Sequence, residues 1–425
     1  MKNTVSNHID FYPQQRFSCR RCGYCCRLAI KITGEEADRL KKTMLPSGKY
    51  PPAEWFIPSP AQPSDFVVAK TADGECVFRE DGGGCVLHEI KAKPLICRVF
   101  PLYIVNWKDG HCSASLRFLC PGVGNTSATL MEHQPEIIAG VAGSLRERMA
   151  AGSVEYSNEN PVSLPVVRHV HAGYKAILHD ETMPLKLRLY ALSRIVDFHA
   201  AKDNYNAVSA ADAGFAADAM NFTCKAIPVL SAELIKGTAS FKDIIDFRIL
   251  LTGYLRDDDP LTVKSSTLRM KMLCAHSIFA AGGGNLRRIN PQAPDIGGKQ
   301  ILNLSSKIAP DDPALEIFRQ FFYGRLDAMH FCGDIVNGLS YEMGIRHLLL
   351  SIPVTFALAA AFARANRKNV IGEDEMLSAV RLLDLTFRYS QFFKLKLTRK
   401  MLQRLSRPSV FAGILNLVFG RKLKL

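Results

Sequence analysis

Apolar residues recur at helical spacing through most of the chain after about residue 126. They fall at Val167, Val170, Tyr174, Ile177 and Leu178 in one segment, and at Leu185, Leu189, Leu192 and Val196 in the next. Residues three and four apart share one face of an α-helix, so each segment predicts an amphipathic helix. Similar patterns predict further helices at 241–255, 261–281, 313–331 and 373–393.

The first 125 residues show a different pattern, in which short apolar runs are separated by glycine, proline and cysteine. The runs at 65–70 and 101–107 predict short strands, and the glycine-rich run at 81–85 predicts a turn. Thr33 is suited to cap a helix over 34–42, because Glu36 three residues later completes a capping box. We therefore predict a small, irregular α+β domain ahead of a helical domain.

These patterns together predict a mainly α fold in three segments. A metal-bound cysteine-cluster domain would occupy residues 1–125, an all-α domain residues 126–389, and a basic amphipathic tail residues 390–425. Glycine, proline and asparagine concentrate at 282–299, which predicts a loop or linker within the helical domain. The apolar stretch 347–365 has only sixteen residues between His347 and Arg364, fewer than the roughly twenty strongly apolar residues of a membrane span, so we expect a buried helix there.

The net charge of +14 is concentrated at the C-terminal end of the chain. No acidic residue follows Asp384, whereas ten bases do: Arg388, Lys394, Lys396, Arg399, Lys400, Arg404, Arg407, Arg421, Lys422 and Lys424. Phe393, Leu397, Met401 and Leu405 are spaced four apart, which predicts an apolar stripe on a basic helix. Either this stripe packs on the helical domain, or the tail docks on an acidic partner or an anionic membrane surface. Specific nucleic-acid binding is not expected, because aromatic residues are not interleaved with the bases.

Nine of the twelve cysteines lie between Cys19 and Cys120, and four of them fall within the eight residues CRRCGYCC. The chain begins MKNTVSNHID, which lacks the apolar core of a secretory signal, so we expect a cytoplasmic protein with reduced thiols. A C-x2-C pair lets two thiolates of one turn face a single ion. One metal site formed by Cys19, Cys22 and either Cys25 or Cys26, and closed by the remote Cys120, is therefore favoured over disulfides.

Two kinds of metal centre fit this run of thiols. The C-x2-C-x2-C spacing, the Cys120-Pro121 pair and the surrounding arginines favour an iron–sulfur cluster, first of the 4Fe–4S type. The guanidinium groups would offset the negative charge of a four-thiolate cluster. A ferredoxin run would place its next cysteine at position 29, which is Ala29, and a closed structural zinc site remains the alternative.

The cysteine pattern resembles a family of zinc- or iron-chelating domains that carry a CxxCxxCC motif. The resemblance rests on FSCRRCGYCC, on GECVFREDGGGCVLHEIKAKPLICRVFPLYI and on CPG, and it covers residues 17–122. It implies metal ligands at Cys19, Cys22, Cys25, Cys26, Cys76, Cys85, Cys97 and Cys120. Lys93-Pro94 replaces the Arg-Pro of that family, His88 stands where it often has tyrosine, and Cys112 lies outside the pattern. Eight thiols exceed the four ligands of one ion, so either two sites exist or some of the thiols only pack around one site.

Flagellin lysine N-methylases resemble this chain in the motif and in the order of a cysteine domain before helices. The similarity extends to residues 167–198 and implies an S-adenosylmethionine-dependent protein-lysine N-methyltransferase that acts on a protein such as flagellin. The sequence contains no Gly-rich methyltransferase turn after a strand and no C-x3-C-x2-C radical motif, so no catalytic residue and no methyl-donor site are assigned. A non-enzymatic metal-binding scaffold and an electron-transfer or redox-sensing iron–sulfur protein are the alternatives.

Overall fold

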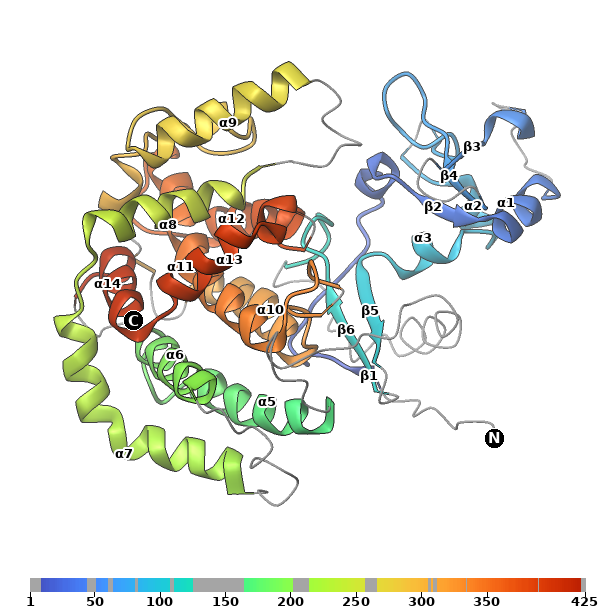
Figure 1. Ribbon diagram of the computed structural model, residues 1–425. Helices are drawn as coiled ribbons and strands as arrows, with labels where there is room; N and C mark the ends of the chain where they lie inside the picture. Colours follow the sequence, from blue (N-terminus) through green and yellow to red (C-terminus); the bar gives the residue numbers. More distant parts are fainter. Residues whose placement is uncertain are drawn as a thin grey trace. The chain divides into compact units, whose positions relative to one another are not determined.

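The structure is a computed structural model, and its chain divides into two compact units (Figure 1). It describes residues 9–43, 51–59, 64–80, 83–107, 111–124, 164–201, 214–256, 266–304, 307–308, 312–333, 335–388 and 390–421. The first unit comprises Met1–Asn106 and His111–Ala150, and the second comprises Trp107–Gly110 and Ala151–Leu425. We call them the cysteine-rich unit and the helical unit. The boundary expected at residue 125 lies outside the described residues.

Two small three-stranded sheets form the frame of the cysteine-rich unit. In one sheet the order is β1 (Ile9–Asp10), β6 (Cys112–Leu116) and β5 (Leu102–Asn106), with β1 parallel and β5 antiparallel to β6. The other sheet is antiparallel, with β4 (Asp65–Val68) between β2 (Lys31–Thr33) and β3 (Phe56–Pro58). The strands expected at 65–70 and 101–107 are both present.

Short helices connect these strands. They are η1 (Tyr24–Arg27), α1 (Gly34–Lys41), η2 (Pro52–Glu54), α2 (Val86–Glu89) and α3 (Leu95–Val99). Helix α1 begins as expected, because the Thr33 side chain accepts from the Glu36 N–H and the Glu36 side chain accepts from the Thr33 N–H. Of the turn expected at 81–85, only residues 83–85 are described, and Gly83 has the positive φ of 87° that favours glycine.

The cysteine-rich unit has an apolar core of its own. Its buried members come from both β-strands and helices: Cys26, Ile30, Ile32, Ala37, Leu40, Trp55, Phe56, Val68, Cys76, Phe78, Val86, Leu87 and Ala92. The rings of Trp55 and Phe78 meet edge to face, with centroids 5.2 Å apart. Two of the predicted ligands, Cys26 and Cys76, are therefore part of the packing that holds this unit together.

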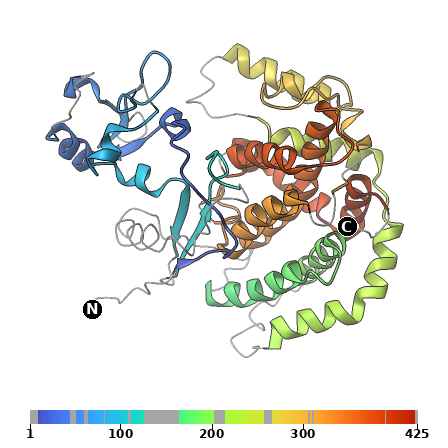
Figure 2. The ribbon, with the colours of Figure 1, turned by 180° about the vertical axis from the view of Figure 1, so that it is seen from behind.

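The helical unit contains the helices that the apolar spacing predicts. They are α5 (Leu164–His179), α6 (Leu185–Ala201), α7 (Gly214–Lys236), α8 (Phe241–Gly253), α9 (Ser266–Ala280), α10 (Pro313–Asp327), α11 (Tyr341–Ala365), α12 (Glu373–Thr386), α13 (Lys396–Leu405) and α14 (Pro408–Phe419). The short helices η5 (Leu286–Arg288), η6 (Ile301–Asn303) and η7 (Gln391–Lys394) lie between them. Helices α5 and α6 pack side by side, as Figure 2 shows from behind. The mainly α fold, with a small α+β region first, is confirmed.

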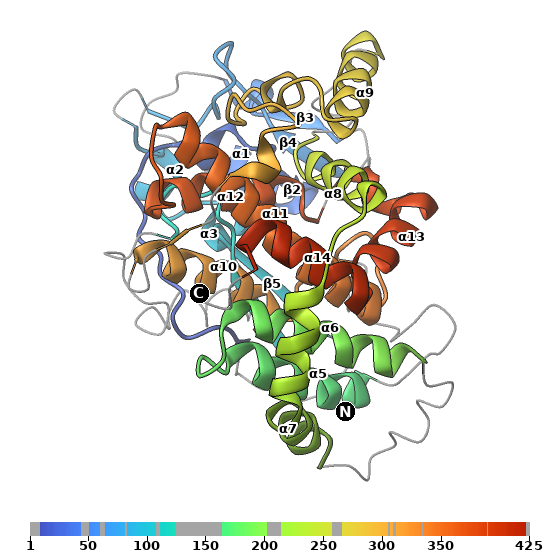
Figure 3. The same ribbon diagram turned by 90° about the vertical axis from the view of Figure 1, so that its left-hand side faces the viewer.

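Helix α11 lies at the centre of the helical unit and packs against α6, α12, α13 and α14 (Figure 3). Among the described residues it is the one helix long and apolar enough to cross a membrane, and 83% of its most apolar window is buried. It contains Pro353 and is the buried helix expected in this stretch.

The C-terminal segment packs within the helical unit, but its apolar face differs from the predicted stripe. Met401 and Leu405 are buried as expected, whereas Leu397 is 79% exposed. Helix α13 begins only at Lys396, so its first turn leaves Leu397 outward and its inner face includes Thr398 and Leu402 instead. Helix α12 also ends earlier than expected, at Thr386, and the chain re-enters the core through η7.

Candidate metal centre

A tight turn presents the first four cysteines. Gly23 has a φ of 70°, and its carbonyl accepts from the Cys26 N–H at 2.9 Å, which starts helix η1. A Cβ at Gly23 would lie 2.6 Å from the Arg79 guanidinium. The positive φ therefore favours glycine in C-G-x-C-C, and the missing side chain also leaves room for the Arg79 guanidinium.

The Cys120 segment is joined directly to the start of this turn. Phe17 and Val123 form an antiparallel bridge, and the Ser18 N–H donates to the Gly122 carbonyl at 3.1 Å. A Cβ at Gly122 would lie only 2.2 Å from the Ser18 carbonyl oxygen. Residues about one hundred positions apart are thus held together by the backbone, next to Cys19 on one side and Cys120 on the other.

Three further cysteines lie on the elements that follow β4. Cys76 forms a bridge with Lys70, Cys85 forms one with Arg79, and Cys97 lies in α3. Cys85 also precedes the first residue of α2. Both Cys85 and Cys97 pack against the apolar core to which Cys26 and Cys76 belong.

The eight predicted ligands range from exposed to buried. Cys19, Cys22 and Cys25 are exposed and Cys120 is half-buried, whereas Cys26 and Cys76 are buried and Cys85 and Cys97 are half-buried. No described cysteine takes part in a disulfide. Cys112, which lies outside the family pattern, is buried on strand β6.

The neighbouring thiols of Cys25 and Cys26 differ in acidity. A hydrogen bond from the Cys26 thiol, assisted by the positive charge of Lys93, lowers the pKa of Cys25 to about 6. The same hydrogen bond and burial raise the pKa of Cys26 well above its usual value. The thiolate form is therefore favoured at Cys25 more than at Cys26, and the thiolate is the form that binds metal.

The charges that act on the remaining thiols indicate which cysteines are neighbours. Burial raises the pKa of Cys120 to about 11, and the charges that add to this shift are those of Cys22, Cys19 and Cys25. Burial likewise raises the pKa of Cys97 to about 12, with contributions from Cys76, Cys25 and Cys85. Two neighbourhoods result, with Cys25 close to both.

Lys70 is part of this site, although no sequence motif singled it out. Its Nζ donates to the carbonyl oxygens of Cys26 and Leu28, at 2.7 Å in the case of Leu28. Burial lowers the pKa of Lys70, and attraction to the thiolate forms of Cys76 and Cys26 opposes that shift. The ammonium group both ties down the CRRCGYCC turn and places a positive charge among the thiols. Its backbone partners lie more than forty residues earlier in the chain, so local sequence contains no signal for this role.

The chemistry of these donors fits zinc or iron, since thiolates are the preferred ligands of both. Mutual repulsion between close thiolates is what a bound cation relieves. Within the described ranges, however, no three or more His, Cys, Asp or Glu side chains are arranged so that they could hold a metal ion. The fit therefore rests on the type and neighbourhood of the donors and not on a preformed coordination geometry.

Comparison with known families supports the same chemistry. Residues 18–113 match the CxxCxxCC family model, described as a putative zinc- or iron-chelating domain, which confirms the resemblance for this part of the chain. The match includes seven of the eight predicted ligands, and Cys120 lies beyond its end. No curated protein and no solved structure matches the chain.

Proposed function

We propose that the cysteine-rich unit chelates metal through two groups of four thiols. The outer group is Cys19, Cys22, Cys25 and Cys120, and the inner group is Cys26, Cys76, Cys85 and Cys97. The observation that carries this division is the Ser18–Gly122 hydrogen bond of 3.1 Å, which keeps the Cys120 segment beside the exposed turn. The inner thiols are grouped by their shared apolar core. Four thiolates satisfy a tetrahedral zinc ion or one iron–sulfur cluster.

For the outer group we propose iron–sulfur and, as the alternative, zinc. Two features support iron–sulfur: the C-x2-C-x2-C spacing, and the arginines around it that offset a negative cluster. For the inner group, burial favours a closed structural site whose role is to hold the unit together.

Metal content of paired variants tests this proposal. Protein purified without air is analysed for zinc, iron and acid-labile sulfide, and its visible absorption is recorded. Cys22→Ser with Cys120→Ser should remove the metal of the outer group, together with the acid-labile sulfide if that metal is a cluster, and leave the metal of the inner group in place. Cys76→Ser with Cys97→Ser should remove the inner metal and leave the outer metal and any sulfide in place. Cys274→Ser, an exposed cysteine of α9, is the control and should change nothing. Loss of all metal from one pair, or of none from both, would refute two separate groups.

A second proposed function is methyl transfer to protein lysine. It is supported by one observation, the order of a small α+β cysteine region followed by a helical region, which is also the order in flagellin lysine N-methylases. Calorimetric titration of the metal-loaded protein with S-adenosylmethionine, followed by mass analysis of flagellin after incubation with both, tests it. If the donor does not bind, the scaffold and redox alternatives remain. An absence of iron in protein purified without air would then exclude the redox one.

A further inference from the structure

The glycine-rich segment 282–299, predicted as a loop or linker, is a loop that packs within the helical unit. Asn285 and Gly297 form a bridge, and the Leu286 N–H donates to the Ile296 carbonyl at 3.1 Å. Leu286 and Ile296 are both buried. A Cβ at Gly298 would lie 2.6 Å from the Phe279 carbonyl oxygen, so the loop packs tightly against the end of α9.

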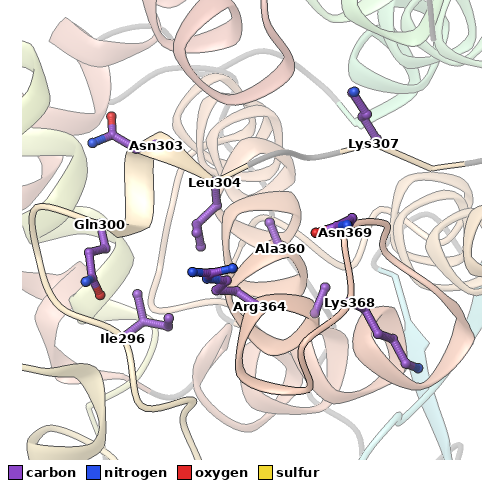
Figure 4. Close-up of a pocket in the computed structure, with 10 residues that line it drawn as sticks. Ile296, Gln300, Asn303, Leu304, Lys307, Ala360, Arg364, Lys368 and Asn369 are labelled. Atoms are coloured by element: carbon purple, nitrogen blue, oxygen red, sulfur yellow. The ribbon is translucent and has the colours of Figure 1, made fainter.

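The end of this loop contributes Ile296 to a cavity of about 580 Å³ (Figure 4). The same side of the cavity continues through η6 to Lys307, and the other side is formed by the C-terminal end of α11 and the residues just after it. The volume lies within the range of small-molecule sites, about 300–1,000 Å³. Apolar side chains of Ile296, Leu304 and Ala360 line it. The side-chain amides of Gln300 and Asn303 also line the cavity, beside these apolar side chains.

The charged side chains that line the cavity are all basic: Lys307, Arg364 and Lys368. Lys368 is already paired with the buried Glu375, with Nζ and Oε1 2.9 Å apart. Among the described residues, neither Lys307 nor Arg364 forms an ion pair. The cavity therefore carries a net positive charge, which attracts an anion.

Capping of α11 does not account for these bases. Basic residues often lie at helix C-termini, where they bond to the last carbonyl groups. Here backbone donors already serve those carbonyls: the N–H groups of Asn366, Arg367 and Lys368 donate to Phe362, Arg364 and Ala363, at 2.9, 3.0 and 2.8 Å. The guanidinium of Arg364 is thus available for a ligand, and Figure 4 shows it just below Leu304, among the side chains that line the cavity.

We propose that this cavity binds a small phosphorylated molecule with an apolar or planar body, such as a nucleotide. Arg364 offers a planar fork that matches two phosphate oxygens. Lys307 lies at the rim, and in Figure 4 its side chain extends away from Arg364. On ligand binding, this flexible side chain would turn toward the phosphate and supply a second positive charge. The apolar wall of Ile296, Leu304 and Ala360 receives the body of the ligand. The Oε1 of Gln300 accepts from the Gly297 N–H at 3.3 Å, so the NH2 group of Gln300 remains to donate to the ligand.

Nucleotide binding to the full chain tests this site independently of the metal groups. ATP, AMP and inorganic phosphate are titrated calorimetrically into wild-type protein at low ionic strength. Arg364→Gln should weaken nucleotide binding about tenfold or more, because a charge-assisted bidentate contact is lost. Arg367→Gln is the matched control: it removes the same charge three residues away, from an exposed side chain that does not line the cavity. Equal thermal unfolding temperatures of the two variants show that neither has lost its fold.

Each outcome is decisive. Nucleotide binding that weakens in Arg364→Gln and stays within about twofold of wild type in Arg367→Gln supports the site. If nucleotide binding weakens equally in both variants, the nucleotide is attracted only by the overall positive charge, and the proposed site is overturned. Inorganic phosphate binding as tightly as ATP and AMP overturns the assignment of an organic body. The absence of binding by all three probes at millimolar concentration overturns the proposal as a whole.

Discussion

Gly122 occupies a position where any side chain would collide with the backbone. Its Cα faces the Ser18 carbonyl, and an added Cβ would come within 2.2 Å of that oxygen. A Cβ is fixed in place by its own backbone and the Ser18 oxygen is a main-chain atom, so no side-chain rotation relieves the contact. The glycine of the Cys-Pro-Gly sequence is thus explained by the close contact between the segments around Ser18 and Gly122. This contact brings Cys120 toward Cys19.

Gly122→Ala should separate these two segments. We expect the variant to lose metal from the outer group and to lower the free energy of unfolding of the cysteine-rich unit by about 1–3 kcal/mol, as overpacking does. The measurements are metal content and denaturation followed by Trp55 fluorescence in a Trp107→Phe background. Gly74→Ala is the control, because Gly74 has a φ of 76° but free space around its Cα. Gly74→Ala should lower the free energy of unfolding by about 1 kcal/mol and leave the metal content unchanged. Full metal content in Gly122→Ala would contradict the role of the crossing.

Lys70→Gln tests the positive charge among the inner thiols. The change removes two hydrogen bonds to the turn that carries Cys26 and one cation that favours the thiolate forms. We expect zinc affinity, measured by chelator competition at pH 7, to fall about tenfold. Lys31→Gln, at an exposed lysine of strand β2, should leave the affinity unchanged. An equal effect of both changes would mean that only the overall charge matters.

Single residues differ in how far sequence reveals them. The cysteines and Gly23 belong to a local motif with fixed spacing, so both the donors and the turn could be read from the sequence. Lys70 could not, because its partners Cys26 and Leu28 come from a segment more than forty residues earlier. The sequence predicted a site from Cys19, Cys22, Cys120 and either Cys25 or Cys26. It could not choose between those two neighbours, because only the folded chain shows that Cys25 is exposed and Cys26 is buried.

At the scale of elements, Glu36 connects two helices. One of its oxygens completes the capping box of α1, and the other accepts from the Leu95 N–H at 2.8 Å, at the start of α3. The first bond follows from the T-x-x-E spacing and was predicted. The second spans 59 positions and places Cys97, two residues beyond Leu95, against the core.

Glu36→Ala should therefore cost more than an ordinary cap. We expect the free energy of unfolding of the cysteine-rich unit to fall by roughly 2–3 kcal/mol, about 1 for the cap and the rest for the buried α3 donor left without a partner. The neighbouring Glu35→Ala removes an exposed glutamate from the same turn and should cost no more than about 0.5 kcal/mol. Denaturation followed by Trp55 fluorescence measures both. Similar costs for the two variants would show that the contact with α3 contributes nothing.

Periodicity predicted which segments are helical better than where the helices begin and end. Helix α12 ends at Thr386 because the chain must turn to bury Phe392 and Phe393 in the core. The four-residue spacing placed Leu397 on the buried stripe, yet α13 begins at Lys396 and rotates that side chain outward. The ends of helices depend on tertiary packing, and a local sequence pattern contains no information about that packing.

At the scale of the whole molecule, metal removal should affect the two units differently. Cys26 and Cys76 lie inside the apolar core of the cysteine-rich unit, so its folding and its metal binding are coupled. Helices α5 to α14 have their own buried faces and no predicted ligand. Chelation should therefore change the fluorescence of Trp55 in the Trp107→Phe background and leave most of the far-UV helical signal, and added zinc should reverse the change. Loss of the entire helical signal would contradict this independence.

The C-terminal segment combines a buried role with a charged surface. Arg404 forms ion pairs with Asp243 and Asp246, and Arg399 donates to the Asn337 carbonyl at 3.0 Å, so these bases serve the fold. Other bases of this segment point to solvent, and two apolar residues beside them are also exposed: Lys394, Lys396 and Lys400 with Leu395 and Leu397. Exposed leucines among lysines are typical of a surface that attaches to anionic lipid.

Replacement of Lys394, Lys396 and Lys400 by glutamine therefore tests membrane attachment without disturbing the buried face of α13. Each lysine near an anionic surface contributes about 1 kcal/mol, so affinity for phosphatidylglycerol-containing vesicles should fall roughly a hundredfold in a sedimentation assay. Added salt should weaken wild-type binding in the same direction. The control replaces Lys225, Lys236 and Lys242, which are equally exposed in the helical unit, and should bind as wild type does. Equal losses in both triple variants would mean attraction by net charge alone. If wild-type protein does not bind the vesicles at low salt, the exposed lysines and leucines do not form a lipid-binding surface.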